Sequence, residues 1–131
     1  MIKNDLIADM IVRIKNAAAT RKETVLFPHS KFSAAVVDVL GRIGYLETLP
    51  KKGKKNSKHL EAKILYVNNL PKFQGARRIS KLSKRVYQKA KDVVSVKSGY
   101  GSLILSTPKG LLTDKEARKE NVGGEALFQI W

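Results

Sequence analysis

The residues of this chain that are best suited to chemistry lie in one short segment, Ser106-Thr-Pro-Lys109. Two hydroxyl groups and a cation this close together suit contacts to sugar and phosphate oxygens. The spacing from Ser106 to Lys109, S-x-x-K, is also the one that penicillin-binding serine enzymes use for a nucleophile and its lysine. An ordinary polar turn has the same composition. These residues alone therefore leave three interpretations open.

The residues around this segment predict a rigid strand that ends at it. Leu103 to Ser106 are mostly apolar and β-favouring, which indicates a strand in a core. Pro108 cannot donate a ladder hydrogen bond and Gly110 permits a turn, so we expect the chain to leave the sheet there. A serine enzyme would need the pair on a buried helix with S-D-N and K-T-G motifs, which the sequence lacks. We therefore predict no catalytic residue and no enzyme.

Charge is the outlying property of the composition. The 131 residues include 26 Lys and Arg against 11 Asp and Glu, a formal net charge of +15. Such an excess repels itself unless a polyanion neutralises it, so the expected partner is nucleic acid. A basic protein without such a partner is the alternative. The apolar fraction of 43% is that of a globular protein.

Several classes of site and location are disfavoured. The chain has no cysteine and only two scattered histidines, so we expect no thiolate chemistry and no metal site. It has no complete dinucleotide fingerprint and no P-loop, so we expect no cofactor and no small-molecule substrate. Its apolar runs are too short to span a bilayer. We expect a cytoplasmic protein, although an organelle matrix would give the same composition.

The amino-terminal half predicts two helices and a strand. Asn4 can cap a first helix with an apolar stripe at Ile7, Met10, Ile11 and Ile14, and an Asp9–Arg13 pair is expected. Thr24 to Phe27 reads as a strand stopped by Pro28. Ser30 can cap a second helix that Gly44 closes. The outward residues of the first helix, Arg13, Lys15 and Asn16, form either a solvated face or an edge that faces phosphates.

The middle of the chain predicts an antiparallel hairpin followed by a boundary. The two strands are residues 45–49 and 60–67, and the loop from Pro50 to His59 carries five lysines and no acid. Pro71 and Gly75 bracket the expected boundary. From Lys72 to Lys91 there are eight Lys or Arg and no acid, which would lay a basic stripe over a half-exposed sheet. Tyr87 in this segment either stacks on a base or ribose or packs in the interior.

The carboxy-terminal part predicts two helices and a final strand. Residues 92–98 indicate a short helix. Thr113 and Glu116 form a capping box for a helix through about Lys119, which Gly123-Gly124 is expected to break. Residues 125–131 complete the chain as an apolar strand.

Four segments in the right order resemble the bacterial small-subunit ribosomal protein S8 family. Asp5-Leu-Ile-Ala-Asp-Met-Ile-Val-Arg-Ile-Lys-Asn-Ala17 is similar to its amino-terminal D-x-I-A-D-M-x-x-R-I-x-N-A motif. Arg85-Val-Tyr87 corresponds to its R-V-Y strand. Ser106-Thr-Pro-Lys-Gly110 resembles its S-T-x-x-G signature, and Gly123-Gly-Glu125 its closing G-G-E. Together the matches extend from end to end of the chain.

The resemblance implies an α+β fold of two lobes. Residues 1–68 would form a helix–strand–helix–strand–strand lobe, 69–75 a linker, and 76–131 a mostly β RNA-binding lobe with short helices. It implies a ribosomal protein that binds a central-domain stem of small-subunit rRNA and nucleates assembly among neighbouring ribosomal proteins. In some bacteria such a protein also represses a ribosomal-protein messenger RNA. Another basic architectural nucleic-acid-binding protein remains the alternative.

The resemblance also implies which residues contact RNA. The main contact would come from the carboxy-terminal lobe, through Tyr87, Ser106, Thr107, Gly123, Gly124 and Glu125. Beside what the resemblance implies, we expect Lys109 to meet a phosphate, and Arg85 is a further candidate for RNA binding. A second contact would come from Asp5, Ile7, Ala8, Arg13, Asn16 and Lys31. The sequence departs from the family at Pro108, where a third hydroxyl is usual, and at Lys81-Leu-Ser-Lys-Arg85, where the usual turn is K-P-G-x-R.

Overall fold

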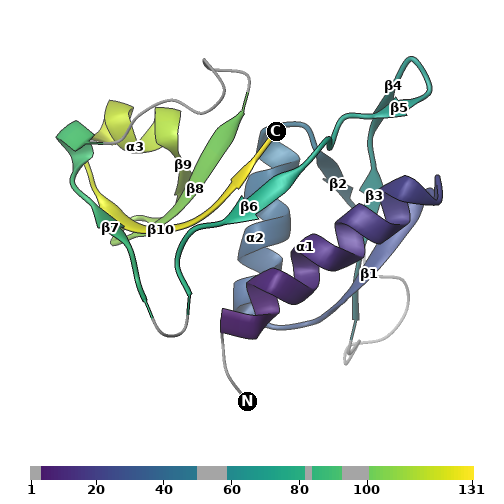
Figure 1. The fold of residues 1–131 in the computed structure, drawn as a ribbon, viewed down its shortest axis with the longest axis horizontal. Coiled ribbons are helices and arrows are strands. Elements are labelled where there is room, and N and C mark those ends of the chain that lie inside the picture. Colours follow the sequence, from purple (N-terminus) through teal and green to yellow (C-terminus); the bar gives the residue numbers. More distant parts are fainter. Residues whose placement is uncertain (1–3, 50–58, 82–83, 93–100) are drawn as a thin grey trace. The chain divides into compact units, whose positions relative to one another are not determined.

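The structure is a computed structural model that describes residues 4–49, 59–81, 84–92 and 101–131. Its α+β architecture confirms the predicted fold class (Figure 1). The lysine loop and most of the helix predicted at 92–98 lie outside the described residues; only the end of a 3₁₀ turn, η1 (Ala90–Asp92), reaches that helix. The chain forms two compact units. One is Asp9–Phe73, and the other combines Gln74–Trp131 with the residues up to Ala8. The division into independent domains at 69–75 stays a prediction.

The unit Asp9–Phe73 holds a three-stranded antiparallel sheet of order β1-β3-β2. The central strand alternates between buried and exposed residues, which leaves one face for the core and one for solvent. Helix α2 packs against β2 and β3 (Figure 1). The elements are α1 (Asn4–Ala19, which begins in the other unit), β1 (Thr24–Pro28), α2 (Lys31–Arg42), β2 (Leu46–Thr48) and β3 (His59–Ile64).

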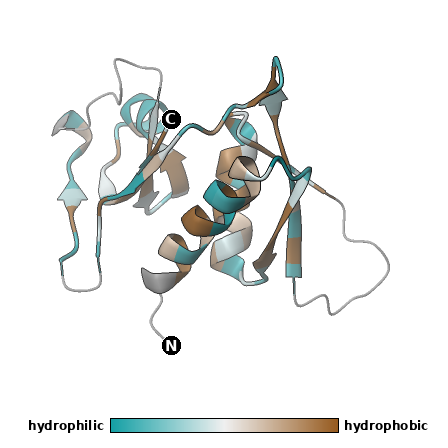
Figure 2. Cartoon of the chain, turned by 45° about the vertical axis from the view of Figure 1, so that its right-hand side comes forward, coloured by the Kyte–Doolittle hydropathy of each residue, from teal (hydrophilic) through white to brown (hydrophobic). Residues whose placement is uncertain are grey.

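The predicted ends of α2 are confirmed. Ser30 and Ser33 form a capping box, with the Ser33 N–H donating to the Ser30 hydroxyl at 3.0 Å and the Ser30 N–H donating to the Ser33 hydroxyl at 2.9 Å. Gly44 follows the helix with a φ of +86°, the left-handed conformation that glycine adopts without strain. Hydropathy colouring shows polar and apolar residues alternating along the helices (Figure 2). Helix α2 therefore has the amphipathic pattern from which it was predicted.

Two strand boundaries differ from prediction. Pro28 is the last residue of β1, which is tolerated because β1 lies at a sheet edge and needs no N–H there. The strand predicted at 60–67 ends at Ile64, and a separate hairpin follows. Asn68 and Asn69 both adopt positive φ, the geometry of a tight hairpin turn, so the segment predicted as a linker includes a strand. The hairpin strands are β4 (Tyr66–Val67) and β5 (Leu70–Pro71).

The unit that contains Gln74–Trp131 is built on one five-stranded antiparallel sheet. Its order is β6-β10-β8-β9, and β7 also pairs with β10. Helix α3 packs against β8 and β9, and Leu103, Leu105, Ala117 and Ala126 form a buried cluster there. The elements are β6 (Ala76–Arg78), β7 (Tyr87–Gln88), β8 (Ser102–Thr107), β9 (Gly110–Thr113), α3 (Asp114–Glu120) and β10 (Gly124–Ile130).

Three predictions about this unit are wrong in detail. The chain does not leave the sheet at Pro108: β8 turns through Pro108-Lys109 into β9, which pairs with it. The end of α3 is set by Asn121 in the left-handed conformation, before the two glycines. The basic stripe on a sheet is not formed, because only Arg77 and Arg78 of the eight Lys and Arg residues from Lys72 to Lys91 lie in a strand.

We expect Thr113→Ala to lower the free energy of unfolding by about 1 kcal/mol, because the Thr113 hydroxyl accepts from the Glu116 N–H at 3.2 Å. Urea unfolding would measure the change. Lys115→Ala, an exposed position in the same helix, is the matched control. Equal stability of the two variants would contradict the capping role.

Candidate nucleic-acid interface

Three of the predicted site residues lie side by side across three strands. Glu125 on β10 is in register with Tyr87 on β7 and with Ser106 on β8. Residues directly opposite in an antiparallel sheet project from the same face, with Cβ atoms about 5 Å apart. We name these three residues the cross-strand row. It presents an aromatic ring, a carboxylate and a hydroxyl together.

The row is open to solvent at one end and sheltered in the middle. Tyr87 is 69% exposed, so its ring is free to stack rather than packed in the interior. The Glu125 side chain is only 14% exposed. Ser106 is half-buried. A flat exposed ring beside sheltered polar groups suits recognition of an unstacked base, with stacking on the ring and hydrogen bonds to its edge.

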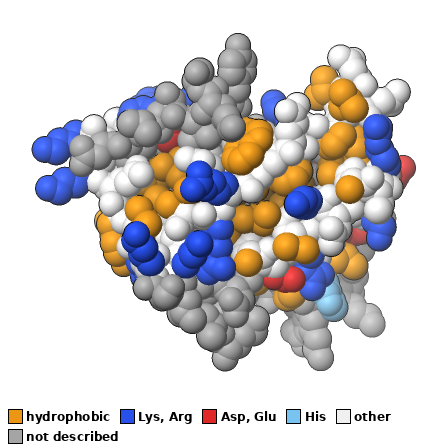
Figure 3. Space-filling view, in the orientation of Figure 1, with side chains coloured by type: hydrophobic (Ala, Val, Ile, Leu, Met, Phe, Trp, Pro, Cys, Tyr) orange, Lys and Arg blue, Asp and Glu red, His pale blue; other side chains and the backbone are white. Residues whose placement is uncertain are grey.

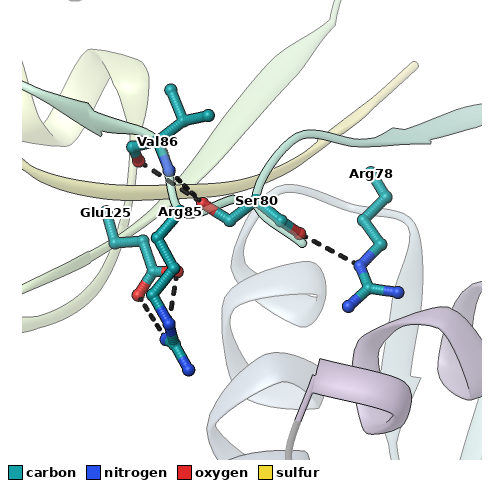
Figure 4. A network of polar contacts seen from close by, with 5 residues as sticks. All are labelled: Arg78, Ser80, Arg85, Val86 and Glu125. Atoms are coloured by element: carbon teal, nitrogen blue, oxygen red, sulfur yellow. Dashed lines mark hydrogen bonds and ion pairs between the residues drawn. The ribbon is translucent and has the colours of Figure 1, made fainter. Parts of the chain in front are cut away.

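Arg85 reaches the middle of the row. Its Nη1 lies 3.3 Å from each carboxylate oxygen of Glu125 (Figure 4). The backbone beside it is held by Ser80, whose buried hydroxyl accepts from the Val86 N–H at 2.9 Å. The Val86 carbonyl in turn accepts from the Ala126 N–H at 2.8 Å. Hydrogen bonds of the Val86 backbone therefore fix the chain next to Arg85, and this positions the guanidinium at the row.

Thr107 and Lys109 make contacts within the protein. The Thr107 hydroxyl donates to the Gly110 carbonyl at 2.8 Å and accepts from the Lys109 N–H at 3.1 Å. It thus fixes the β8–β9 turn and retains one lone pair for a ligand. Lys109 forms an ion pair with Glu120 at 3.0 Å, on an exposed surface. Such a surface pair is weak, so a phosphate could displace it.

Gly123 and Gly124 lie where backbones approach closely. A Cβ on Gly123 would come within 2.8 Å of the Cα of Lys89 and would overlap the Gln88 carbonyl oxygen. A Cβ on Gly124 would come within 2.8 Å of the Ser106 carbonyl carbon and overlap its oxygen. Both glycines are thus required by the packing of β10 against its neighbours, whatever they contact beyond the protein.

The amino-terminal site residues differ in accessibility. Asn16 and Lys31 are exposed, and Ala8 is half-buried. Ile7 is 5% exposed, so its side chain serves the hydrophobic core. The expected ion pair of Arg13 with Asp9 is confirmed at 2.8 Å, and Arg13 Nη1 also donates to the Leu26 carbonyl at 3.0 Å. The side chain of Asp5 lies outside the description.

Sequence reasoning missed the role of Ser80 and the Arg85–Glu125 contact. A single serine among lysines forms no pattern. The ion pair joins residues 40 positions apart, a pairing that only the sheet establishes. One signal in the sequence pointed to such a contact. Residues 72–91 contain no acid, so any ion pair made by their cations must join another part of the chain.

Positive charge predominates on one face of the chain. On the face drawn in Figure 3, most of the charged side chains in view are Lys or Arg. Within the described ranges, no group of three or more histidine or acidic side chains could hold a metal ion. No helix among those residues is long and apolar enough to cross a membrane.

Comparison with known proteins decides the family. The sequence matches the family described as ribosomal protein S8 over residues 5–131. The chain belongs to the ribosomal protein S8 family. As a member it is a small-subunit ribosomal protein, a structural constituent and not an enzyme, as the sequence resemblance predicted.

Individual relatives agree with the family over full length. The small ribosomal subunit protein uS8 of Mycoplasmopsis agalactiae is 47% identical over 131 residues, which cover 100% of both chains. The uS8 protein of Persephonella marina is 47% identical over 133 residues, 97% of this chain and 98% of that one. The uS8 protein of Rhizorhabdus wittichii is 40% identical over 131 residues and 100% of both chains. The S8 similarity therefore includes every segment discussed above.

We expect Gly124→Ala to destabilise the protein by about 2 kcal/mol, because the new methyl group must displace the Ser106 backbone and overpacking of this kind costs roughly 1–3 kcal/mol. Chemical unfolding would measure it. Gly41→Ala in α2 is the control, since its nearest neighbour would lie at an ordinary 3.6 Å. That control is expected to be neutral or stabilising. A Gly124→Ala variant of unchanged stability would contradict the close approach.

Proposed function

We propose that this S8 family member binds small-subunit rRNA, with its main contact on the cross-strand row and the β8–β9 turn. The RNA element is a stem of the central domain, and binding it early nucleates assembly of that domain in the cytoplasm. The observation that carries the proposal is the register that brings Tyr87, Glu125 and Ser106 together from three strands. The net charge of +15 supports an anionic partner.

The chemistry of the row suits irregular RNA. The major groove of an A-form stem is too narrow for side chains, so proteins read its shallow minor groove and its unstacked bases. The exposed Tyr87 ring can stack on such a base. The Ser106 hydroxyl can donate to or accept from a 2′-hydroxyl. Glu125 can accept from a base amino group, and this would give selectivity that phosphate contacts do not give.

A second contact would come from the amino-terminal residues. Asn16 and Lys31 are exposed and suit phosphate or sugar oxygens, and Arg13 lies three residues before Asn16. Asp5, Ile7 and Ala8 belong to the same proposed contact, and the burial of Ile7 restricts it to the backbone there. This contact would supply affinity, while the cross-strand row would supply selectivity. In this proposal the lobes 1–68 and 76–131 each contribute one contact.

The proposed partners beyond this RNA follow from the same surface. Neighbouring small-subunit ribosomal proteins would meet the chain in the assembled particle. A ribosomal-protein messenger RNA that imitates the stem would bind the same row, and the protein would then repress its translation. The messenger and the stem would therefore compete for the protein.

Binding to the cognate central-domain stem and to a scrambled duplex of equal length would test the proposal. We expect the stem to bind at least tenfold more tightly, a discrimination of about 1.4 kcal/mol. Equal affinity would refute it. Duplex DNA that competes as well as the stem does would instead indicate a general architectural nucleic-acid-binding protein.

Replacement of Tyr87 separates stacking from the phenol hydroxyl. We expect Tyr87→Ala to weaken cognate binding by roughly 1–3 kcal/mol, the contribution of one stacked base. Tyr87→Phe keeps the ring and should retain most of the affinity. Val67→Ala, which removes an exposed apolar side chain outside the site, is the control. Titration of labelled stem RNA measures all three, and an equal loss for Ala and Phe would argue against stacking.

Thr107→Ala should weaken cognate binding by about 1 kcal/mol or more, because the turn loses two hydrogen bonds and the ligand loses an acceptor. Thr107→Ser keeps the hydroxyl and should bind nearly as well as the unchanged protein. The same titration measures both. Unchanged affinity of the Ala variant would remove Thr107 from the site.

A further inference from the structure

Glu125 is an unexpected residue in a site for a polyanion. It is the only acid of the cross-strand row, and its side chain is 14% exposed. A carboxylate near phosphates is repelled, and a buried one is costly unless a cation neutralises it. The row therefore needs a cation that balances this carboxylate where it would face RNA.

Arg85 supplies that feature through an incomplete contact. A single nitrogen, Nη1, lies between the two carboxylate oxygens, 3.3 Å from each. Charge-assisted hydrogen bonds are usually shorter, about 2.7–2.9 Å, and an arginine fork usually uses two nitrogens. Within the described part of the chain, Arg85 is the side chain that donates to Glu125. The charge of the carboxylate is thus balanced, and about two of its roughly four lone-pair sites stay available.

The guanidinium also retains capacity. Its side chain is 45% exposed, and its contacts with Glu125 use Nη1 alone. The remaining N–H groups can donate to a phosphate oxygen of a bound RNA. One guanidinium can therefore hold the carboxylate on one side and a phosphate on the other.

We propose that Arg85 is a positioning residue for Glu125: it neutralises the carboxylate and aims it so that it accepts a hydrogen bond from a base amino group of the bound RNA. The base selectivity of the row then belongs to the Arg85–Glu125 pair and to neither residue alone. This inference rests on the proposed RNA-binding function. It differs from a simple phosphate contact, in which Arg85 would act independently of Glu125.

A double-mutant cycle tests the coupling. Arg85→Ala, Glu125→Gln and the double variant are titrated against the cognate stem. We expect Arg85→Ala to weaken binding about tenfold or more in the unchanged protein, and about threefold or less when Glu125→Gln is also present. The neutral amide needs no neutralising partner, so the loss of the guanidinium should matter less. Losses that are equal in the two backgrounds overturn the proposal.

Control variants separate this role from charge and from folding. Arg77→Ala removes an exposed cation of β6 and should cost the same in both backgrounds. Arg85→Lys keeps the charge and should recover part of the affinity lost in Arg85→Ala. Thermal unfolding of each variant checks that the sheet is intact. If Arg85→Ala unfolds, the same cycle run with Arg85→Lys and Arg85→Gln decides the question.

The ratio of cognate to scrambled binding distinguishes the two levels of the proposal. If the unchanged protein does not discriminate, the proposed function fails. If it discriminates and Arg85→Ala lowers cognate and scrambled binding by the same factor, Arg85 is a general phosphate contact and only this inference fails. We expect Arg85→Ala to lower the ratio by about tenfold, since it acts through the carboxylate that reads the base.

Discussion

The antiparallel pairing of β10 with its neighbours on both sides is the constraint on which the carboxy-terminal unit depends. One edge of β10 pairs with β8, and the other edge pairs with β7 near its start and β6 near its end. A register shift between Ala126 and Phe128 places three consecutive residues in the core, where a regular strand would alternate. The site therefore lies on a strand whose hydrogen bonds and side chains are both fixed.

This pairing requires particular residues around the cross-strand row. Gly123 and Gly124 permit the close approach of β10 to β7 and β8, and the Thr107 hydroxyl closes the turn that follows β8. The Ser80 hydroxyl accepts from the Val86 N–H and so holds the backbone next to Arg85. These residues support the geometry of the row, whereas Tyr87 projects from it into solvent. The same motifs therefore contain residues that the packing of the sheet requires and a residue that is open to solvent.

Much of the fold could be predicted from the sequence, because local patterns determine it. The apolar stripe and capping residues fixed α2, and the Thr113–Glu116 capping box fixed the start of α3. Strand pairing was harder to predict. Strand β9 was missed because Pro108 and Gly110 usually mark the point where a chain leaves a sheet, although the same residues also fit a two-residue turn between paired strands. The β4–β5 hairpin was missed because its two turn asparagines read as linker.

The sequence by itself determined the family, the excess of positive charge and the residue types of the candidate site, since these are properties of order and composition. Only the tertiary structure decided which of those residues meet. Ser106, Thr107 and Lys109 are neighbours in sequence, but their surroundings differ. Thr107 bonds to Gly110 and Lys109 pairs with Glu120, whereas Ser106 lies opposite Glu125 in the sheet. Register across strands depends on long-range packing, and therefore no local pattern could place Arg85 against a carboxylate 40 residues away.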